Sequence, residues 1–250
     1  MNAWIITIGD EILTGRVLNW NAYWIAKRLT SIGIIVNRIV CIPDDVDTIA
    51  SIVREAINTS VSYIFTTGGL GPTPGDVTLL GISRATDKKL VLSEKALSYI
   101  RSRYEELYRL GLVRSGEINE HREKMAYVPE GSEVVYNDIG AAPGVIVKHE
   151  ASTIICLPGV PSEAMYLLEK ILPMISTEAS LKVVEDYIDV SDESVVVRIL
   201  RELQDKYPNV NIKTYPLGFG QKKMRVISMG RNRDEVYEAL RFLKKKIREG

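Results

Sequence analysis

Cysteine and histidine are scarce in this sequence. The 250 residues include two of each, so neither a disulfide scaffold nor a metal site of closely spaced cysteines is expected. Cys41 and Cys156 each lie in an apolar run, which is typical of buried free thiols. His121 and His149 form no recognisable set of metal ligands. We therefore expect both histidines in ordinary surface or loop positions.

The sequence also lacks an excess of either charge and any long hydrophobic run. Its 32 Lys and Arg residues equal its 32 Asp and Glu residues. No global field therefore favours nucleic acid or an anionic membrane, and a basic site would have to be local. The apolar run after Met1 is too short to cross a bilayer and follows no basic segment. We expect a cytoplasmic protein without nucleic-acid or membrane partners.

Short β-branched runs alternate with stretches whose apolar residues recur at helical spacing. This pattern predicts strands over 4–8, 34–41, 63–66, 134–135, 144–147 and 154–157, and helices over 21–31, 46–58, 78–86, 93–110 and 161–175. Strands and helices that alternate over short loops indicate a mostly parallel sheet covered on both faces. The predicted fold class is therefore α/β, a three-layer α/β/α sandwich.

The pattern changes near Ala179. From there the sequence predicts a strand, a helix, two strands and a helix, over 181–190, 192–207, 210–215, 222–229 and 231–248. This order is typical of a small α+β unit with helices on an antiparallel sheet. We expect an α/β domain over residues 1–178 and a small accessory domain over 179–250, which serves packing or oligomerisation.

The strongest local feature is a glycine-rich segment, residues 66–76, between an apolar strand and a helix. Parallel α/β proteins bind ligands at this position, and glycines let the backbone approach a ligand closely. Exposed N–H groups beside a helix N-terminus can bind an anion. The candidate ligand-binding residues are Thr67, Gly68, Gly69, Gly71 and Thr73. A tight turn that binds nothing is the alternative, since this is neither a Walker loop nor a GxGxxG motif.

A second polar group follows the first predicted strand. It comprises Gly9, Asp10, Glu11, Asn19 and Asn21. In a doubly wound sheet the first and third strands end at the same edge. We therefore expect the two carboxylates to face the glycine loop and the asparagines to contact polar ligand groups, although Asp10 alone also suits a helix cap.

Acidic residues follow the second predicted strand as well. Asp44 and Asp45 end it on the same edge. Together with Asp76 they offer oxygen ligands to Mg²⁺, which typically takes one or two carboxylates plus ligand phosphates. Helix capping is the alternative role for Asp44 and Asp45.

The fourth feature joins two later loops. Asn137 precedes the segment 140–144, and Pro158, Gly159 and Ser162 lie in another strand-to-helix loop. Ser162 and the helix start after it are candidates for binding an anion. Four such loops at one sheet edge favour a binding site over a coincidence of turns.

In this order the four features resemble the CinA family, whose N-terminal domain shares the MoaB/Mog-type fold of molybdenum-cofactor biosynthesis proteins. The matching stretches are 9–15, 19–21, 67–73 with Asp76, and 157–161. The resemblance spans roughly residues 4–175, and the βαββα tail resembles the segment that follows this domain in the family.

The resemblance implies two activities. One is metal-dependent hydrolysis of a pyrophosphate such as that of ADP-ribose, and the other is non-catalytic binding of molybdopterin or a related phosphorylated ligand. By position, the glycines of the loop would cradle phosphate, and Asp45 and Asp76 would be catalytic and would bind the metal. Mg²⁺ is the expected cation, with Co²⁺ or Mn²⁺ as alternatives, and a homodimer is the expected assembly.

The sequence departs from the family in two places. Pro74 and Gly75 stand where the family usually has a histidine and an aspartate before the residue that matches Asp76. The amidase domain that ends many bacterial members is absent from this sequence, so no deamidase activity is expected. Three hypotheses remain open: a hydrolase, a binding protein, and an oligomeric scaffold whose ancestral site has decayed.

Overall fold

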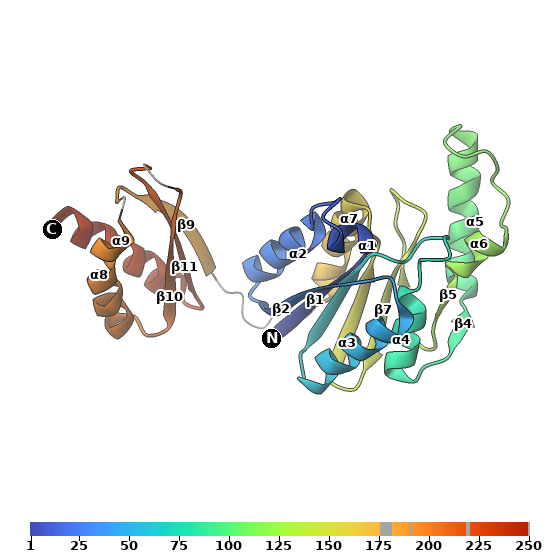
Figure 1. Ribbon diagram of the computed structural model, residues 1–250, viewed down its shortest axis with the longest axis horizontal. Helices are drawn as coiled ribbons and strands as arrows, with labels where there is room; N and C mark the ends of the chain where they lie inside the picture. The colour runs from blue at the N-terminus through green and yellow to red at the C-terminus, as the bar shows by residue number, and fades with distance from the viewer. Residues whose placement is uncertain (176–181, 191, 219–220, 250) are drawn as a thin grey trace. The chain divides into compact units, whose positions relative to one another are not determined.

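A computed structural model describes residues 1–175, 182–190, 192–218 and 221–249 (Figure 1). The chain divides into two compact units, one of residues 1–28 and 35–176 and one of residues 29–34 and 177–250. The predicted domain boundary, between residues 178 and 179, lies outside the described residues.

The first unit is built on a six-stranded sheet with the order β2-β1-β3-β8-β7-β6. Its strands are β1 (Asn2–Ile8), β2 (Ile35–Ile42), β3 (Tyr63–Thr67), β6 (Glu133–Val135), β7 (Gly144–His149) and β8 (Ser152–Leu157). The first three and β8 pair in parallel, whereas β7 runs antiparallel to both of its neighbours. The predicted α/β fold with a mostly parallel sheet is confirmed.

Helices cover both faces of this sheet, with α3 and α4 on one side and α2 and α7 on the other (Figure 1). Their bounds are α2 (Trp20–Ser31), α3 (Val46–Asn58), α4 (Thr78–Thr86) and α7 (Pro161–Ile171). Alternate residues of β1 point to opposite faces. Trp4, Ile6 and Ile8 join the core under α3 and α4. Ile5, which points to the opposite face, is fully buried as well.

The sequence patterns did not predict several short helices and strands. They are α1 (Asp10–Leu13), β4 (Leu90–Leu92), α6 (Glu120–Lys124), β5 (Tyr127–Pro129) and η1 (Leu172–Met174). The predicted helix over 161–175 was too long, because Pro173 has no N–H to continue an α-helix and the last turn is a 3₁₀-helix. Helix α5 (Glu94–Arg109) begins after Ser93, whose side chain accepts a hydrogen bond from the N–H of Ala96.

The second unit is a small α+β structure, as predicted. Its sheet has the order β10-β11-β9, all antiparallel, and its strands are β9 (Lys182–Ile188), β10 (Val210–Pro216) and β11 (Met224–Gly230). Helices α8 (Glu193–Lys206) and α9 (Arg233–Glu249) pack on one face around a separate core. Among the described residues of the whole chain, no helix is long and apolar enough to cross a membrane.

Candidate functional site

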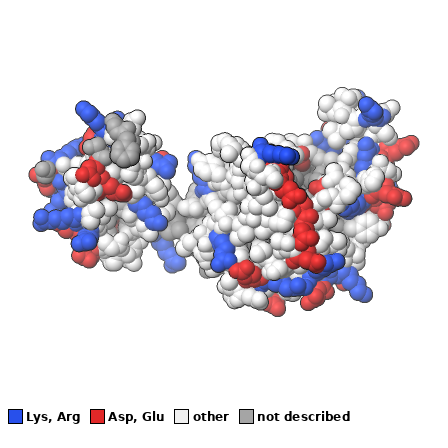
Figure 2. All heavy atoms as spheres, viewed as in Figure 1, with Lys and Arg blue, Asp and Glu red and all other residues white. Residues whose placement is uncertain are grey.

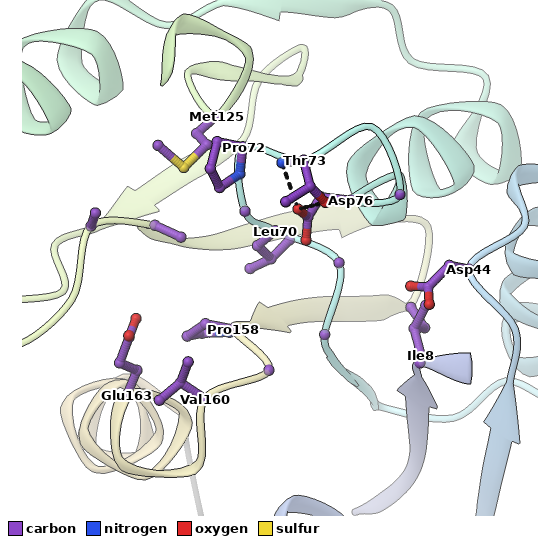
Figure 3. A pocket seen from close by; sticks show the side chains of 18 of the residues that line it. Ile8, Asp44, Leu70, Pro72, Thr73, Asp76, Met125, Pro158, Val160 and Glu163 are labelled. Atoms are coloured by element: carbon purple, nitrogen blue, oxygen red, sulfur yellow. Dashed lines mark hydrogen bonds between the residues drawn. The ribbon is translucent and has the colours of Figure 1, made fainter. Parts of the chain in front are cut away.

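Four parallel strands end at one edge of the sheet, and a cavity of about 490 Å³ lies there (Figure 3). The residues after β1 and β3 are tied to the ends of neighbouring strands: the N–H of Gly9 donates to the carbonyl of Ile42, and that of Gly68 to the carbonyl of Leu157, both over 3.1 Å. The cavity is lined by Ile8, Gly9, Glu11, Asp44, residues 68–73, Gly75, Asp76, Tyr104, Met125, Ala141, Ala142, residues 158–160 and Glu163. All four of the predicted loop regions therefore contribute to one cavity.

The glycine loop after β3 needs glycine at two positions. Gly68 has φ +106°, and a Cβ there would lie 2.1 Å from the carbonyl oxygen of Ile8. Gly69 has φ +64°, and its Cβ would lie 2.2 Å from Oγ1 of Thr78. That hydroxyl donates to the carbonyl of Gly68 over 2.8 Å, so the start of α4 holds the loop. Neither left-handed position accommodates a side chain.

The same loop offers hydrogen-bond donors to the cavity. Among the described residues, no acceptor is found for the backbone N–H groups of Gly69, Leu70 and Gly71. All three residues line the cavity. Successive N–H groups in a turn of this kind form an anion-binding concavity.

Carboxylates line the cavity, and no Lys or Arg side chain does so among the described residues. Figure 3 shows Asp44 and Asp76 on one side of the cavity and Glu163 on the other. Burial raises the pKa of the Asp44 carboxyl, and repulsion from Asp10, Glu11 and Asp76 raises it further, against the hydrogen bond from the N–H of Asp10. Figure 2 shows Asp and Glu side chains in a stripe along this unit. The charged side chains among the described residues that line the cavity are therefore all acidic.

Asp76 is held at the end of the glycine loop. Its Oδ2 accepts hydrogen bonds from the N–H of Thr73 over 2.8 Å and from its hydroxyl over 2.6 Å. The ammonium of Lys124 donates to the carbonyl of Thr73. Thr73 and Asp76 line the cavity as a unit, with Gly75 between them.

Asp45 does not line the cavity, contrary to the predicted catalytic and metal-binding role. It is the N-cap of α3, and its Oδ2 accepts from the N–H and hydroxyl of Thr48 over 2.8 and 2.7 Å. These hydrogen bonds lower the pKa of its carboxyl. The neighbouring Asp44 lines the cavity instead. The chain turns at Asp44, where the N–H of Asp45 donates to the carbonyl of Pro43 over 2.8 Å, so the two side chains point to different sides.

The predicted polar residues Asn19, Asn21 and Thr67 surround a second, smaller cavity of about 60 Å³. Asn19 accepts hydrogen bonds from the hydroxyl of Thr7 and the N–H of Ala22. The amide nitrogen of Asn21 donates to Oγ1 of Thr67 over 2.7 Å and to the carbonyl of Gly159 over 2.8 Å. Its Oδ1 is buried, and no donor for it is present in the described part of the chain.

The remaining predicted residues divide between the two cavities and the surface. Glu11, Gly68 and Gly159 line both cavities, whereas Pro158 lines only the larger one. Asp10 is exposed and contributes its backbone N–H to Asp44.

Ser162 is exposed and lines neither cavity, whereas Pro161 lines the smaller cavity and Glu163 lines the larger one. The sequence analysis missed Glu163. Its Oε2 accepts from Nδ2 of Asn137 over 2.6 Å. Asn137 is fully buried, and it also binds the loop through the N–H of Gly140 and the carbonyl of Ala142. This buried amide positions one wall of the cavity.

The described residues contain no group of three His, Cys, Asp or Glu side chains placed to hold a metal ion. Neither His121 nor His149 lines the cavity. A cation at this site would therefore share its coordination between the protein and a ligand.

The fold is that of an α/β domain with a cavity at the carboxyl ends of its parallel strands, and comparison identifies its family. Residues 4–177 match the probable molybdopterin binding domain, and the chain belongs to this family. A protein of Pyrococcus furiosus is 40% identical over 255 residues, covering 100% of both chains. A protein of Saccharolobus solfataricus is 38% identical over 239 residues, covering 93% of this chain and 85% of the relative.

A solved structure is similar to the same domain. It is the crystal structure of the protein CinA, described as having unknown function, from Thermoplasma acidophilum. It is 34% identical with a TM-score of 0.63, and the match covers 70% of this chain and 98% of that chain. The predicted resemblance to the CinA family is confirmed.

Proposed function

We propose that the larger cavity binds a phosphorylated ligand with a divalent cation and hydrolyses a nucleotide-type pyrophosphate such as that of ADP-ribose. One observation carries this proposal: a single cavity is lined by the carboxylates of Asp44 and Asp76 and by the glycine loop, whose N–H groups have no acceptor among the described residues. Such donors suit phosphate oxygens, and such carboxylates suit the cation that accompanies a diphosphate.

The glycine loop would bind the phosphates. Its donors come from Gly69, Leu70 and Gly71, and α4 begins a few residues later at Thr78. The partial positive charge of that helix start adds to the attraction for an anion. Because these groups are fixed before the ligand arrives, they would also stabilise charge that develops on phosphoryl oxygens.

The residues that line the cavity suit Mg²⁺, whereas a metal whose ligands all come from the protein would need more of them. Mg²⁺ keeps water and phosphate ligands and needs only one or two carboxylates, which Asp44 and Asp76 would supply. Burial first, and then repulsion from Asp10, Glu11 and Asp76, raises the pKa of Asp44, and a bound cation would offset the repulsion. When bound, the cation would act as a Lewis acid on a phosphoryl oxygen. Co²⁺ and Mn²⁺ remain the alternatives to test.

Glu163 would act on the opposite side of the cavity. One of its carboxylate oxygens is fixed by Asn137, and no hydrogen bond to the other is found among the described residues. A carboxylate held in this way can orient water and accept its proton. In this proposal Asp44 and Asp76 bind the cation, and Glu163 orients the attacking water.

Non-catalytic binding of molybdopterin or a related ligand is the second candidate function. It is favoured by Pro74 and Gly75, since no ionisable side chain stands between Thr73 and Asp76. In this case the glycine loop would hold the phosphate of the ligand without cutting it.

Release of AMP from ADP-ribose, with and without Mg²⁺, Mn²⁺ or Co²⁺, separates these functions. Hydrolysis predicts metal-dependent release that disappears in Asp76→Asn, which keeps an oxygen to accept from Thr73. Asp47→Asn is the matched control, because Asp47 is exposed, pairs with Arg84 and lies outside the cavity. Binding alone predicts no release and a ligand-dependent rise in melting temperature. Metal-dependent release that persists in Asp76→Asn would contradict the proposed site.

A further inference from the structure

The larger cavity has more room than a pyrophosphate needs. Its volume of about 490 Å³ lies in the range of pockets that enclose a whole drug-sized ligand. Besides the glycine loop and the carboxylates, the cavity has a set of apolar residues that we name the apolar lining, which consists of Leu70, Pro72, Tyr104, Met125, Ala141 and Ala142. In Figure 3, Asp76 lies between Asp44 and the side chains of Pro72 and Met125. The cavity therefore offers space for an uncharged group beside the phosphates.

Tyr104 is the aromatic member of the apolar lining. It comes from α5, and its side chain is 9% exposed. The guanidinium of Arg122 lies over its ring, 3.8 Å from the centroid. Arg122 is itself held, because it donates to the carbonyls of Ser115 and Glu117 over 2.7 and 2.6 Å. The ring is thus fixed in place, and a ligand in the cavity can reach only the parts of it that Arg122 leaves uncovered.

The hydroxyl of Tyr104 has no hydrogen-bond partner among the described residues. The hydroxyl of a buried tyrosine usually finds a partner. Tyr99, from the same helix, is an example, since its hydroxyl donates to the carbonyl of Asn137 and accepts from the N–H of Asn137. An almost fully buried side chain that lines a cavity and has an unpaired hydroxyl points to a ligand that supplies the missing partner.

We propose that the apolar lining binds a flat nitrogen heterocycle, and that Tyr104 contacts it through the uncovered part of its ring and through its hydroxyl. This inference rests on the proposed function, because phosphates on the glycine loop would bring the heterocycle of the same ligand into the cavity. A tyrosine hydroxyl donates to ring nitrogens and accepts from amino groups, so the base of an adenine nucleotide and a pterin both have the required chemistry. The apolar lining thus selects a ligand that carries such a ring over bare pyrophosphate.

Calorimetry in the presence of Mg²⁺ tests the two parts of the cavity separately. Inorganic pyrophosphate probes the glycine loop, and adenosine and hydroxymethylpterin probe the apolar lining. ADP and hydroxymethylpterin diphosphate probe both parts together. At least one of these two diphosphates should bind about tenfold more tightly than inorganic pyrophosphate, since contact between a base and an aromatic side chain strengthens binding by about fivefold to a hundredfold. The diphosphate that does so identifies the ring.

Two substitutions test the part of Tyr104. Tyr104→Phe keeps the ring that Arg122 covers and removes only the hydroxyl, so it should weaken binding of the identified ring compound by about threefold to tenfold. Its affinity for pyrophosphate and its melting temperature should not change. Tyr104→Leu should weaken binding of the ring compound by about tenfold or more. Tyr108→Phe is the matched control and should bind every probe normally, since Tyr108 lies on the same helix, is 55% exposed and lies outside the cavity.

The outcomes distinguish this inference from the proposed function. If pyrophosphate binds but neither diphosphate binds more tightly, or if both Tyr104 variants bind the ring compounds as the natural protein does, the inference is overturned and the proposed function stands. If a ring compound binds in a manner that depends on Tyr104 but pyrophosphate does not bind, the proposed function fails and the inference stands. No binding of any probe would overturn both.

Discussion

Replacing Asp44 by asparagine should make the protein more stable and its binding of a divalent cation weaker. Burial and the carboxylates of Asp10, Glu11 and Asp76 raise the pKa of the Asp44 carboxyl. A raised pKa in the folded state means that ionisation of Asp44 disfavours folding. The neutral amide removes this cost and keeps an oxygen to accept from the N–H of Asp10.

The size of the effect follows from the exposure of the site. Asp44 is partly exposed, so water screens the repulsion and the gain should be about 0.5–1 kcal/mol. For a protein of this size that corresponds to a rise in Tm of about 1–4 °C. The destabilisation by Asp44 is absent below its ordinary pKa and complete above the raised one. The gain should therefore appear at pH 7 and disappear in strong acid.

Thermal unfolding with and without Mg²⁺ measures both effects in one experiment. Without metal, Asp44→Asn should melt above the natural protein, and with metal and ADP-ribose it should gain less from the ligand. The loss in cation affinity should be about tenfold or more. Asp47→Asn is the control, since Asp47 pairs with Arg84 and lies outside the cavity. A less stable Asp44→Asn, or unchanged cation binding, would refute the reasoning.

Three further substitutions test other parts of the structure. Gly68→Ala should lower the free energy of unfolding clearly more than Gly111→Ala. Both positions have positive φ, which costs a side chain about 1–2 kcal/mol, but only at Gly68 would the new Cβ also clash with the carbonyl of Ile8. Equal losses in urea unfolding would disprove the clash. Asp45→Asn should leave stability and ligand binding nearly unchanged in thermal shift assays, because asparagine is an equally good N-cap. Asn137→Ala should lower the free energy of unfolding by about 2–4 kcal/mol, because it leaves buried loop groups unpaired; a loss under 1 kcal/mol in urea would contradict that role.

The location of the site was predictable from the sequence, because parallel strands end at one edge of a sheet and polar residues follow four predicted strands. The glycine loop, Asp76 and Gly159 line the cavity for this reason. The fold class was predictable on the same basis, since buried strands and amphipathic helices alternate along the first 175 residues.

Which of two neighbouring residues lines the cavity was not predictable from the sequence. Asp44 and Asp45 are adjacent, and only the backbone conformation decides that Asp45 caps α3 while Asp44 lines the cavity. Thr48, three residues after Asp45, was the one available signal, since an N-cap bonds at that spacing. In the same way, the rotation of the first turn of α7 turns Glu163 to the cavity and Ser162 to solvent.

Contacts between segments far apart in the chain could not be predicted from the sequence either. Tyr104 and Met125 complete the cavity from α5 and from the residue after α6, far from any of the motifs. Asn137 was noticed as part of a loop, but its role depends on a buried network with Glu163 that no local spacing reveals.

The most direct test of the central claim is the affinity for ADP-ribose with and without Mg²⁺, measured by calorimetry. A methylene group in place of the bridging oxygen of its pyrophosphate prevents turnover during the titration. If the cavity binds phosphate and cation together, Mg²⁺ should tighten binding of this analogue to the natural protein and to Asp47→Asn, but not to Asp76→Asn. Binding that is absent, or that is the same with and without Mg²⁺ in all three proteins, would contradict the account.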